Sequence, residues 1–146
     1  MAKMTWDPNL DVKKLVTEWM EGVYGAGAGP MEGWFDALHE RVKDPNRHVY
    51  VYVAPDANLF PPELIAQGDK FFDQAQQLTA DDPLASEYVA KSRLWLRYVK
   101  IYLRGKADDE FKQFMADVKK FGIGQMREGM PTDAWEADFV KNHPAK

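Results

Sequence analysis

Groups of neighbouring carboxylates are the residues of this sequence best placed for acid–base chemistry, because two carboxylates suffice to hydrolyse a glycosidic bond. The candidate groups are Asp7 with Asp11, Asp81 with Asp82, and Asp108 and Asp109 with Glu110. Each group also stands where a helix is expected to begin, and there a carboxylate accepts hydrogen bonds from free backbone amides. Helix capping therefore explains all three groups, and we predict no catalytic residue among them.

The histidines do not have the spacing of a metal site. His39, His48 and His143 are far apart in the sequence, and none has a second histidine three or four residues away. Glu40 follows His39 directly, but adjacent residues of a helix point in different directions and do not bind one metal ion together. We interpret the histidines as surface residues and predict no metal ligand.

The sequence also lacks a complete motif for a catalytic serine and for a nucleotide-binding loop. The two serines, Ser86 and Ser92, fall within a predicted helix and lack the Gly-x-Ser-x-Gly turn that exposes a nucleophilic oxygen. The glycine-rich segment 25–29 follows a predicted helix instead of a strand, and the Lys-Ser/Thr pair of a phosphate-binding loop does not come after it. We interpret this segment as a connection between helices and predict no cofactor.

Aromatic residues are abundant, at 13% of the chain. Four tryptophans fall on the apolar stripes of predicted helices and are expected in the core: Trp19, Trp34, Trp95 and Trp135. Tyr50 and Tyr52 share one face of a strand-like segment and are the candidate residues for stacking on a sugar. Trp6 precedes the first predicted helix, where it could pack against a neighbouring domain.

Composition and charge exclude several classes of protein. A net charge of −4 argues against nucleic-acid binding, which needs a basic surface. The basic residues between Lys91 and Arg104 are interpreted as one solvated side of a helix. The N-terminus has no signal-peptide pattern, and no apolar run reaches the ~20 residues of a membrane-spanning helix. Cysteine is absent, which fits reducing and oxidising compartments alike, so the sequence leaves the location open.

Apolar spacing predicts a mostly α-helical single domain over residues 1–146, a bundle of five to six helices with one or two short extended segments. The expected helices cover residues 12–24, 30–42, 62–78, 83–103, 108–121 and 132–140, with Leu78 on the buried side of the third. Gly25 and Gly105 are expected to end the first and fourth helices, and Thr132 is expected to cap the last. The later half of the fourth helix is apolar nearly all round, and this helix is expected at the centre of the packing. The strand-like segment His48–Val53 needs a partner for its backbone groups. Three readings stay open: it is an extended connection, it pairs with Gly122–Arg127, or it pairs outside the chain.

Five short motifs together resemble the helical C-terminal region of a protein family. They are Lys3-Met-Thr-Trp-Asp-Pro-Asn-Leu-Asp-Val12, Glu18-Trp-Met-Glu-Gly-Val-Tyr-Gly25, Leu59-Phe-Pro-Pro-Glu-Leu64, Ala80-Asp-Asp-Pro83 and Ile123-Gly-Gln-Met-Arg-Glu-Gly129. The family comprises bacterial glycoside-hydrolase-like proteins with a domain of unknown function, distant relatives of α-glucuronidases and β-hexosaminidases. The chain departs from the family pattern at Val23, where a tyrosine is usual, and in the glycine-rich segment 25–29.

The resemblance implies that a (β/α)₈ barrel precedes this region and carries the catalytic carboxylates, so none transfers to this chain. The chain alone is then not an enzyme, and it packs against the barrel through an apolar face with Trp6, Pro8 and Trp19 at the interface. Without the barrel, a sizeable exposed apolar patch is expected. The alternatives are a carbohydrate-binding module that uses Tyr50 and Tyr52, a small enzyme with an unrecognised acid pair, and a stand-alone helical protein of another role.

Overall fold

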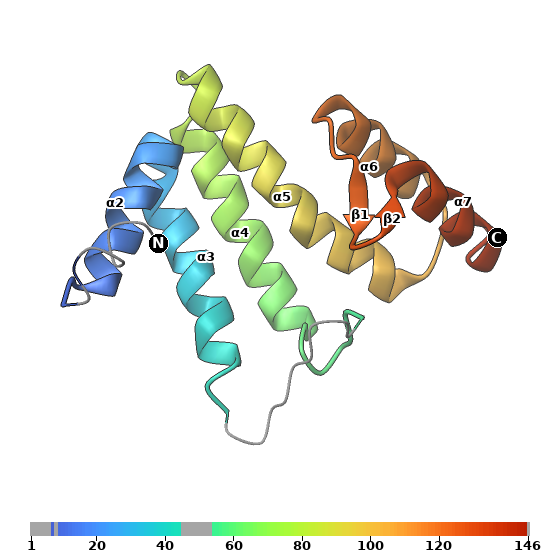
Figure 1. Ribbon diagram of the computed structural model, residues 1–146, viewed down its shortest axis with the longest axis horizontal. Helices are drawn as coiled ribbons and strands as arrows, with labels where there is room; N and C mark the ends of the chain where they lie inside the picture. Colours follow the sequence, from blue (N-terminus) through green and yellow to red (C-terminus); the bar gives the residue numbers. More distant parts are fainter. Residues whose placement is uncertain (1–6, 8, 45–53, 146) are drawn as a thin grey trace. The chain divides into compact units, whose positions relative to one another are not determined.

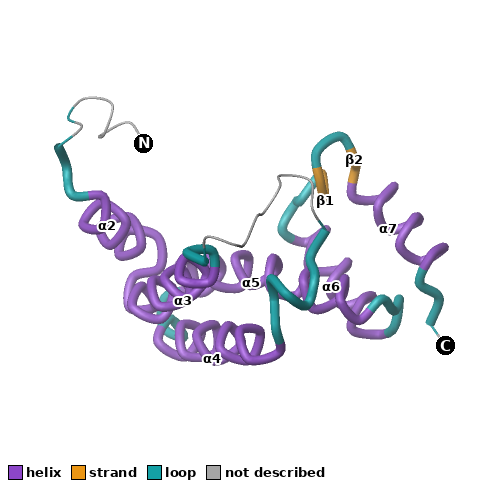
Figure 2. Tube along the Cα trace, turned by 90° about the horizontal axis from the view of Figure 1, so that it is seen from below, coloured by secondary structure: helices purple, strands orange, loops and turns teal. Residues whose placement is uncertain are grey.

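The computed structural model describes residues 7, 9–44 and 54–145. Its α-helices are α2 (Val12–Tyr24), α3 (Ala28–Arg41), α4 (Pro62–Leu78), α5 (Pro83–Arg104), α6 (Asp109–Lys120) and α7 (Thr132–Asn142) (Figure 1). A 3-10 turn, η1 (Gly25–Gly27), joins α2 to α3, and strands β1 (Gln125–Arg127) and β2 (Met130–Pro131) form an antiparallel hairpin. Helices dominate the described chain (Figure 2), so the predicted mostly α-helical class is confirmed.

The chain divides into two compact units. The first unit combines Met1–Val49 with Ala66–Ala90, and the second combines Tyr50–Ile65 with Lys91–Lys146. The boundary between residues 65 and 66 falls inside α4, and the boundary between residues 90 and 91 falls inside α5. Each of these two helices therefore contributes residues to both units. The first unit therefore carries α2 and α3, and the second carries α6, the hairpin and α7.

Aspartates begin three of the helices, as the sequence predicts. Asp11, Asp82 and Asp108 each accept hydrogen bonds from backbone amides of the following turn, with N···O distances between 2.9 and 3.2 Å. These bonds satisfy amides that have no partner within the helix. One member of each carboxylate group is therefore a structural cap.

Two glycines end helices in backbone conformations that other residues rarely adopt. Gly25 ends α2 with φ of +50°, and Gly105 follows α5 with φ of +59°. The Gly105 amide donates to the carbonyl of Ile101 at 2.9 Å, which closes the last turn. Both helix ends were predicted from the glycines, because a side chain is strained at positive φ.

The core of the first unit lies between α2, α3, α4 and the first part of α5. Its buried apolar side chains are Met20, Tyr24, Ala28, Met31, Trp34, Phe72, Ala75, Ala85 and Val89. The Trp34 and Phe72 rings lie 6.2 Å apart, and they join α3 to α4. Thr79 is fully buried at the end of α4, whereas Leu78, which was expected inside, is 55% exposed.

The core of the second unit is an apolar cluster with aromatic rings at its centre. It contains Leu94, Ile101, Ala107, Phe111, Phe114, Met115, Val118, Trp135 and Phe139. Phe111 and Phe139 stack at 4.8 Å with an interplanar angle of 10°, and Trp135 contacts both rings. These contacts fix α7 on α6, and the Trp135 ring also lies 5.6 Å from the Tyr98 ring of α5.

Ion pairs join α5 to α6 and correct the interpretation of the basic side chains. Arg97 Nη1 lies 2.6 Å from Asp117 Oδ2, and both side chains are about three-quarters buried. Arg104 pairs with Asp108 at 2.9 Å and also with Glu110. The predicted solvated stripe is therefore wrong for Arg97 and Arg104, whose charges are compensated within the second unit.

The Arg97–Asp117 pair predicts a pH dependence of stability. Burial raises the pKa of the Asp117 carboxyl, but the hydrogen bonds from Arg97 and Gln113 and the charge of Arg97 outweigh it, and the net pKa lies below the ordinary 3.8. The folded state thus gains stability from Asp117 above the unfolded pKa and loses it as the pH falls through the folded pKa.

We expect Asp117→Asn to be less stable than the wild type at neutral pH and the difference to shrink at about pH 3. Urea unfolding of both proteins at the two pH values measures this. A stability difference of the same size at both pH values would contradict the assignment.

Two further expectations change with the structure. The Thr132 hydroxyl donates to the Ile123 carbonyl at 2.5 Å instead of capping α7, whose N-cap residue is Pro131. Gly122–Arg127 does contain a strand, but within the described residues its partner is β2. The segment His48–Val53 lies outside the described residues, so its pairing remains a prediction.

Candidate interaction surface

One side of α2 carries apolar side chains that are exposed or only partly buried. Val12, Val16, Trp19 and Val23 follow one another at spacings of four, three and four residues, which places them on one side of a helix. Val12 is 53% exposed and Trp19 is 56% exposed, while Val16 and Val23 are partly buried. We call these four residues the α2 face.

A neighbouring stripe of α2 holds the helix against α3. Met20 and Tyr24 are buried, and the Thr17 hydroxyl donates to Glu32 Oε1 at 2.9 Å. The Trp19 indole meets the Tyr24 ring edge-on, with centroids 5.9 Å apart and an interplanar angle of 88°. The buried tyrosine therefore supports the exposed tryptophan from within, so the indole has a defined orientation.

The α2 face has no charged member. Of the four charged residues of α2, Lys14 and Glu21 lie roughly half a turn around the helix from it, given about 100° of rotation per residue. Glu18 lies about 130° and Lys13 about 90° from the centre of the face. An uncharged stripe with an exposed, oriented tryptophan is typical of the centre of a protein–protein contact. The arrangement suits docking of an apolar surface and offers no group for catalysis.

The structure describes one of the predicted interface residues. Trp19 lies on the α2 face, which corrects its expected place in the core. Trp6 and Pro8, the other predicted interface residues, lie outside the described residues, as do the predicted sugar-stacking residues Tyr50 and Tyr52. Their roles remain predictions.

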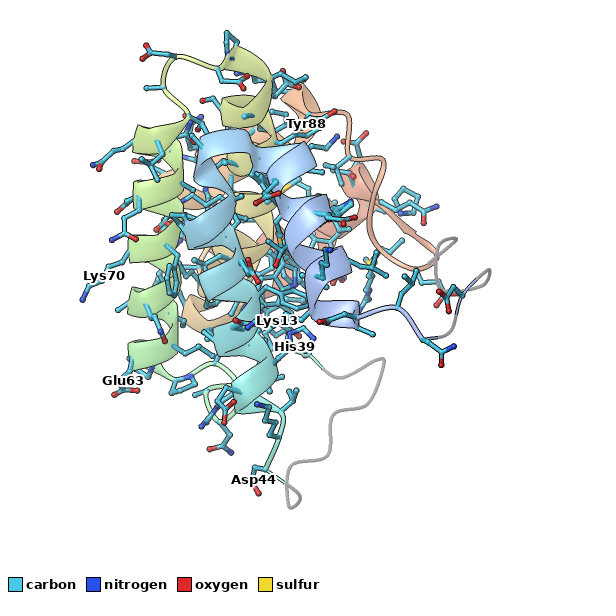
Figure 3. All side chains as sticks on the ribbon, turned by 90° about the vertical axis from the view of Figure 1, so that its left-hand side faces the viewer. Lys13, His39, Asp44, Glu63, Lys70 and Tyr88 are labelled. Atoms are coloured by element: carbon cyan, nitrogen blue, oxygen red, sulfur yellow. The ribbon has the colours of Figure 1, made fainter. Side chains whose placement is uncertain are left out.

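Within the described residues, no group of three or more histidine, cysteine or acidic side chains could hold a metal ion. His39 lies near the end of α3 (Figure 3), and its Nδ1 is 2.8 Å from the Phe35 carbonyl oxygen. The His143 ring lies 4.6 Å from the Phe139 ring, at an interplanar angle of 35°. The two histidines among the described residues thus each contact a residue four positions earlier in the chain.

Ser86 and the glycine-rich segment 25–29 both have structural roles. Ser86 accepts a hydrogen bond from the side-chain amide of Gln76. Segment 25–29 forms η1 and the start of α3, so the predicted connection between helices is confirmed. No helix among the described residues is both long and apolar enough to cross a membrane.

Sequence reasoning missed an exposed aromatic row on α5. Trp95, Tyr98 and Tyr102 lie on one side of the helix, and Trp95 is 43% exposed although it was expected in the core. The spacing of three and seven residues was visible in the sequence. It was overlooked because the later half of this helix is apolar nearly all round, which indicated burial from several sides.

Comparisons with protein-family models, with curated proteins and with solved structures find no match to this chain.

Proposed function

We propose that this chain is a non-catalytic helical accessory domain that packs through its α2 face against the catalytic (β/α)₈ barrel of a glycoside-hydrolase-like protein. The observation that carries the proposal is the exposure of Val12 and Trp19 on a helix whose neighbouring stripe is firmly packed. The motif resemblance, which includes Glu18–Gly25 of α2, supplies the kind of partner.

Covering the α2 face would contribute substantially to the free energy of binding a partner. A tryptophan buries about 150–250 Å² when fully covered. Covering the exposed half of Trp19 at about 25 cal/mol per Å² contributes about 2–3 kcal/mol, before any contribution from the valines. Trp19 is therefore expected to dominate the contact, as aromatic anchors do in other interfaces.

Reading the source gene upstream of Met1 and measuring binding to the barrel test this proposal. We expect a barrel-encoding segment there, and we expect that barrel, produced separately, to bind the chain in calorimetric titration. Trp19→Ser should weaken binding by roughly 30-fold or more, which corresponds to a loss of about 2–3 kcal/mol.

Val140→Ser is the matched control, because Val140 is 45% exposed on α7 and is not part of the α2 face. Its affinity should equal that of the wild type. Equal affinities for the wild type and Trp19→Ser, or the absence of any barrel-encoding segment upstream, would overturn the proposal.

A further inference from the structure

The second unit presents three aromatic rings along one side of α5. Trp95, Tyr98 and Tyr102 are separated by three and four residues, so they occupy successive turns of the helix. Trp95 is exposed, and Tyr98 and Tyr102 are partly buried. We call these three residues the α5 aromatic row.

Other rings hold the row in place from within. Phe60, which is buried, meets Trp95 edge-on at 5.4 Å and 74°. Tyr98 lies 5.6 Å from the buried Trp135 and 5.9 Å from Tyr102. A ligand that settles on the row therefore meets side chains that are already ordered, which lowers the entropic cost of binding.

Polar groups accompany the rings. Burial, and to a smaller extent Tyr102, raises the pKa of the Tyr98 hydroxyl above its ordinary 10.0, whereas the positive charge of Arg127 opposes this rise. The phenol is thus protonated at neutral pH and is near an exposed guanidinium of the hairpin. The Tyr98 and Tyr102 hydroxyls can each donate and accept hydrogen bonds, and the Arg127 guanidinium can donate them.

We infer that the α5 aromatic row binds an oligosaccharide of flat, equatorially substituted pyranose rings. Such a ring has an apolar C–H face that stacks on an indole or phenol, and hydroxyls around its rim that both donate and accept hydrogen bonds. Trp95 and Tyr102 are seven residues apart, which is about 10 Å along the helix axis and close to the length of a disaccharide.

The charges of the second unit disfavour a nucleic acid as the ligand. Arg97 and Arg104 are engaged with acidic side chains of the same unit, and the whole chain is acidic. A proline-rich peptide is the other ligand that aromatic rows bind. It offers mainly carbonyl acceptors, whereas Tyr98 and Tyr102 can also accept hydrogen bonds, which sugar hydroxyls supply.

Affinity electrophoresis in gels that contain hydroxyethyl cellulose, arabinoxylan or laminarin tests the inference on the intact chain. We expect at least one of these β-glycans to retard the wild type, and the matching oligosaccharide to change its tryptophan fluorescence. Trp95→Ala should weaken binding by about 10-fold or more, and Tyr102→Phe, which keeps the ring and removes the hydroxyl, by a smaller factor.

Tyr88→Ala is the control, because Tyr88 is a 41% exposed tyrosine at another position of α5, in the first unit. It should bind as the wild type does. Retardation by none of the three glycans, unchanged binding in both Trp95→Ala and Tyr102→Phe, or binding of a proline-rich peptide in place of the glycans would overturn the inference.

Trp19→Ser separates this inference from the proposed accessory role. The substitution lies in the first unit and should leave glycan retardation unchanged while it weakens binding to the barrel. Loss of glycan binding in Trp19→Ser with retention in Trp95→Ala would place the sugar on the α2 face and would overturn the assignment to α5.

Discussion

Replacement of Trp135 by alanine is expected to lower the free energy of unfolding by about 3–5 kcal/mol. Trp135 is 4% exposed, and its indole lies against Tyr98, Phe111, Phe114 and Phe139. Removing it leaves a cavity at the point where α5, α6 and α7 meet. Neighbouring rings cannot fill that space without leaving their stacked positions, so most of the cost of the cavity should persist.

Trp19→Ala is the matched control, because it makes the same chemical change at a tryptophan that is 56% exposed. It loses the edge-on contact with Tyr24 and should cost no more than about 1 kcal/mol. Urea unfolding followed by far-UV circular dichroism compares the variants. Similar losses for the two substitutions would mean that Trp135 does not organise the core of the second unit.

Gly27→Ala is expected to lower the free energy of unfolding by about 1–3 kcal/mol, through overpacking between η1 and α4. A Cβ atom at this position would lie 2.9 Å from Thr79 Cγ2 and 3.3 Å from the Ala75 carbonyl oxygen. Thr79 is fully buried, and its hydroxyl donates to that same carbonyl at 2.9 Å. Neither neighbour can move away without breaking this bond or shifting the backbone of α4.

Gly22→Ala is expected to stabilise the protein, in contrast to Gly27→Ala. Gly22 is in the middle of α2, and no atom among the described neighbours lies within 4 Å of a Cβ built there. Alanine lowers the entropy of the unfolded chain and should raise the free energy of unfolding by about 0.5–1 kcal/mol. Thermal unfolding of both variants provides the test, and a destabilised Gly22→Ala or a neutral Gly27→Ala would contradict the packing described for the first unit.

The sequence by itself determined the features that depend on neighbouring residues in the chain. Asp11, Asp82 and Asp108 cap helices because their carboxylates reach amides two or three residues away, whatever the rest of the fold does. Gly25 and Gly105 end helices because their backbone conformation is accessible to glycine at little cost. Apolar spacing therefore gave the helices and the mostly α-helical class, with bounds close to those observed.

The tertiary structure decided which side of each helix is covered. Trp19 and Trp34 both fall on apolar stripes, yet Trp34 packs on Phe72 and Trp19 faces solvent. An apolar pattern predicts that a side chain prefers burial, but it does not predict which surface covers that side chain. The exposed α2 face and the α5 aromatic row, on which the functional proposals depend, became visible only with the neighbours of each helix in place.

The acidic partners of Arg97 and Arg104 on α5 could not be predicted from the sequence for the same reason. Arg97 and Arg104 occupy positions that would also suit a solvated stripe, and Asp117 is twenty residues beyond Arg97 in the sequence. Thr132 likewise has the residue type of a cap, but its hydroxyl bonds to Ile123, nine residues earlier. Local sequence specifies helices because their hydrogen bonds span four residues, whereas these contacts depend on how distant segments pack together.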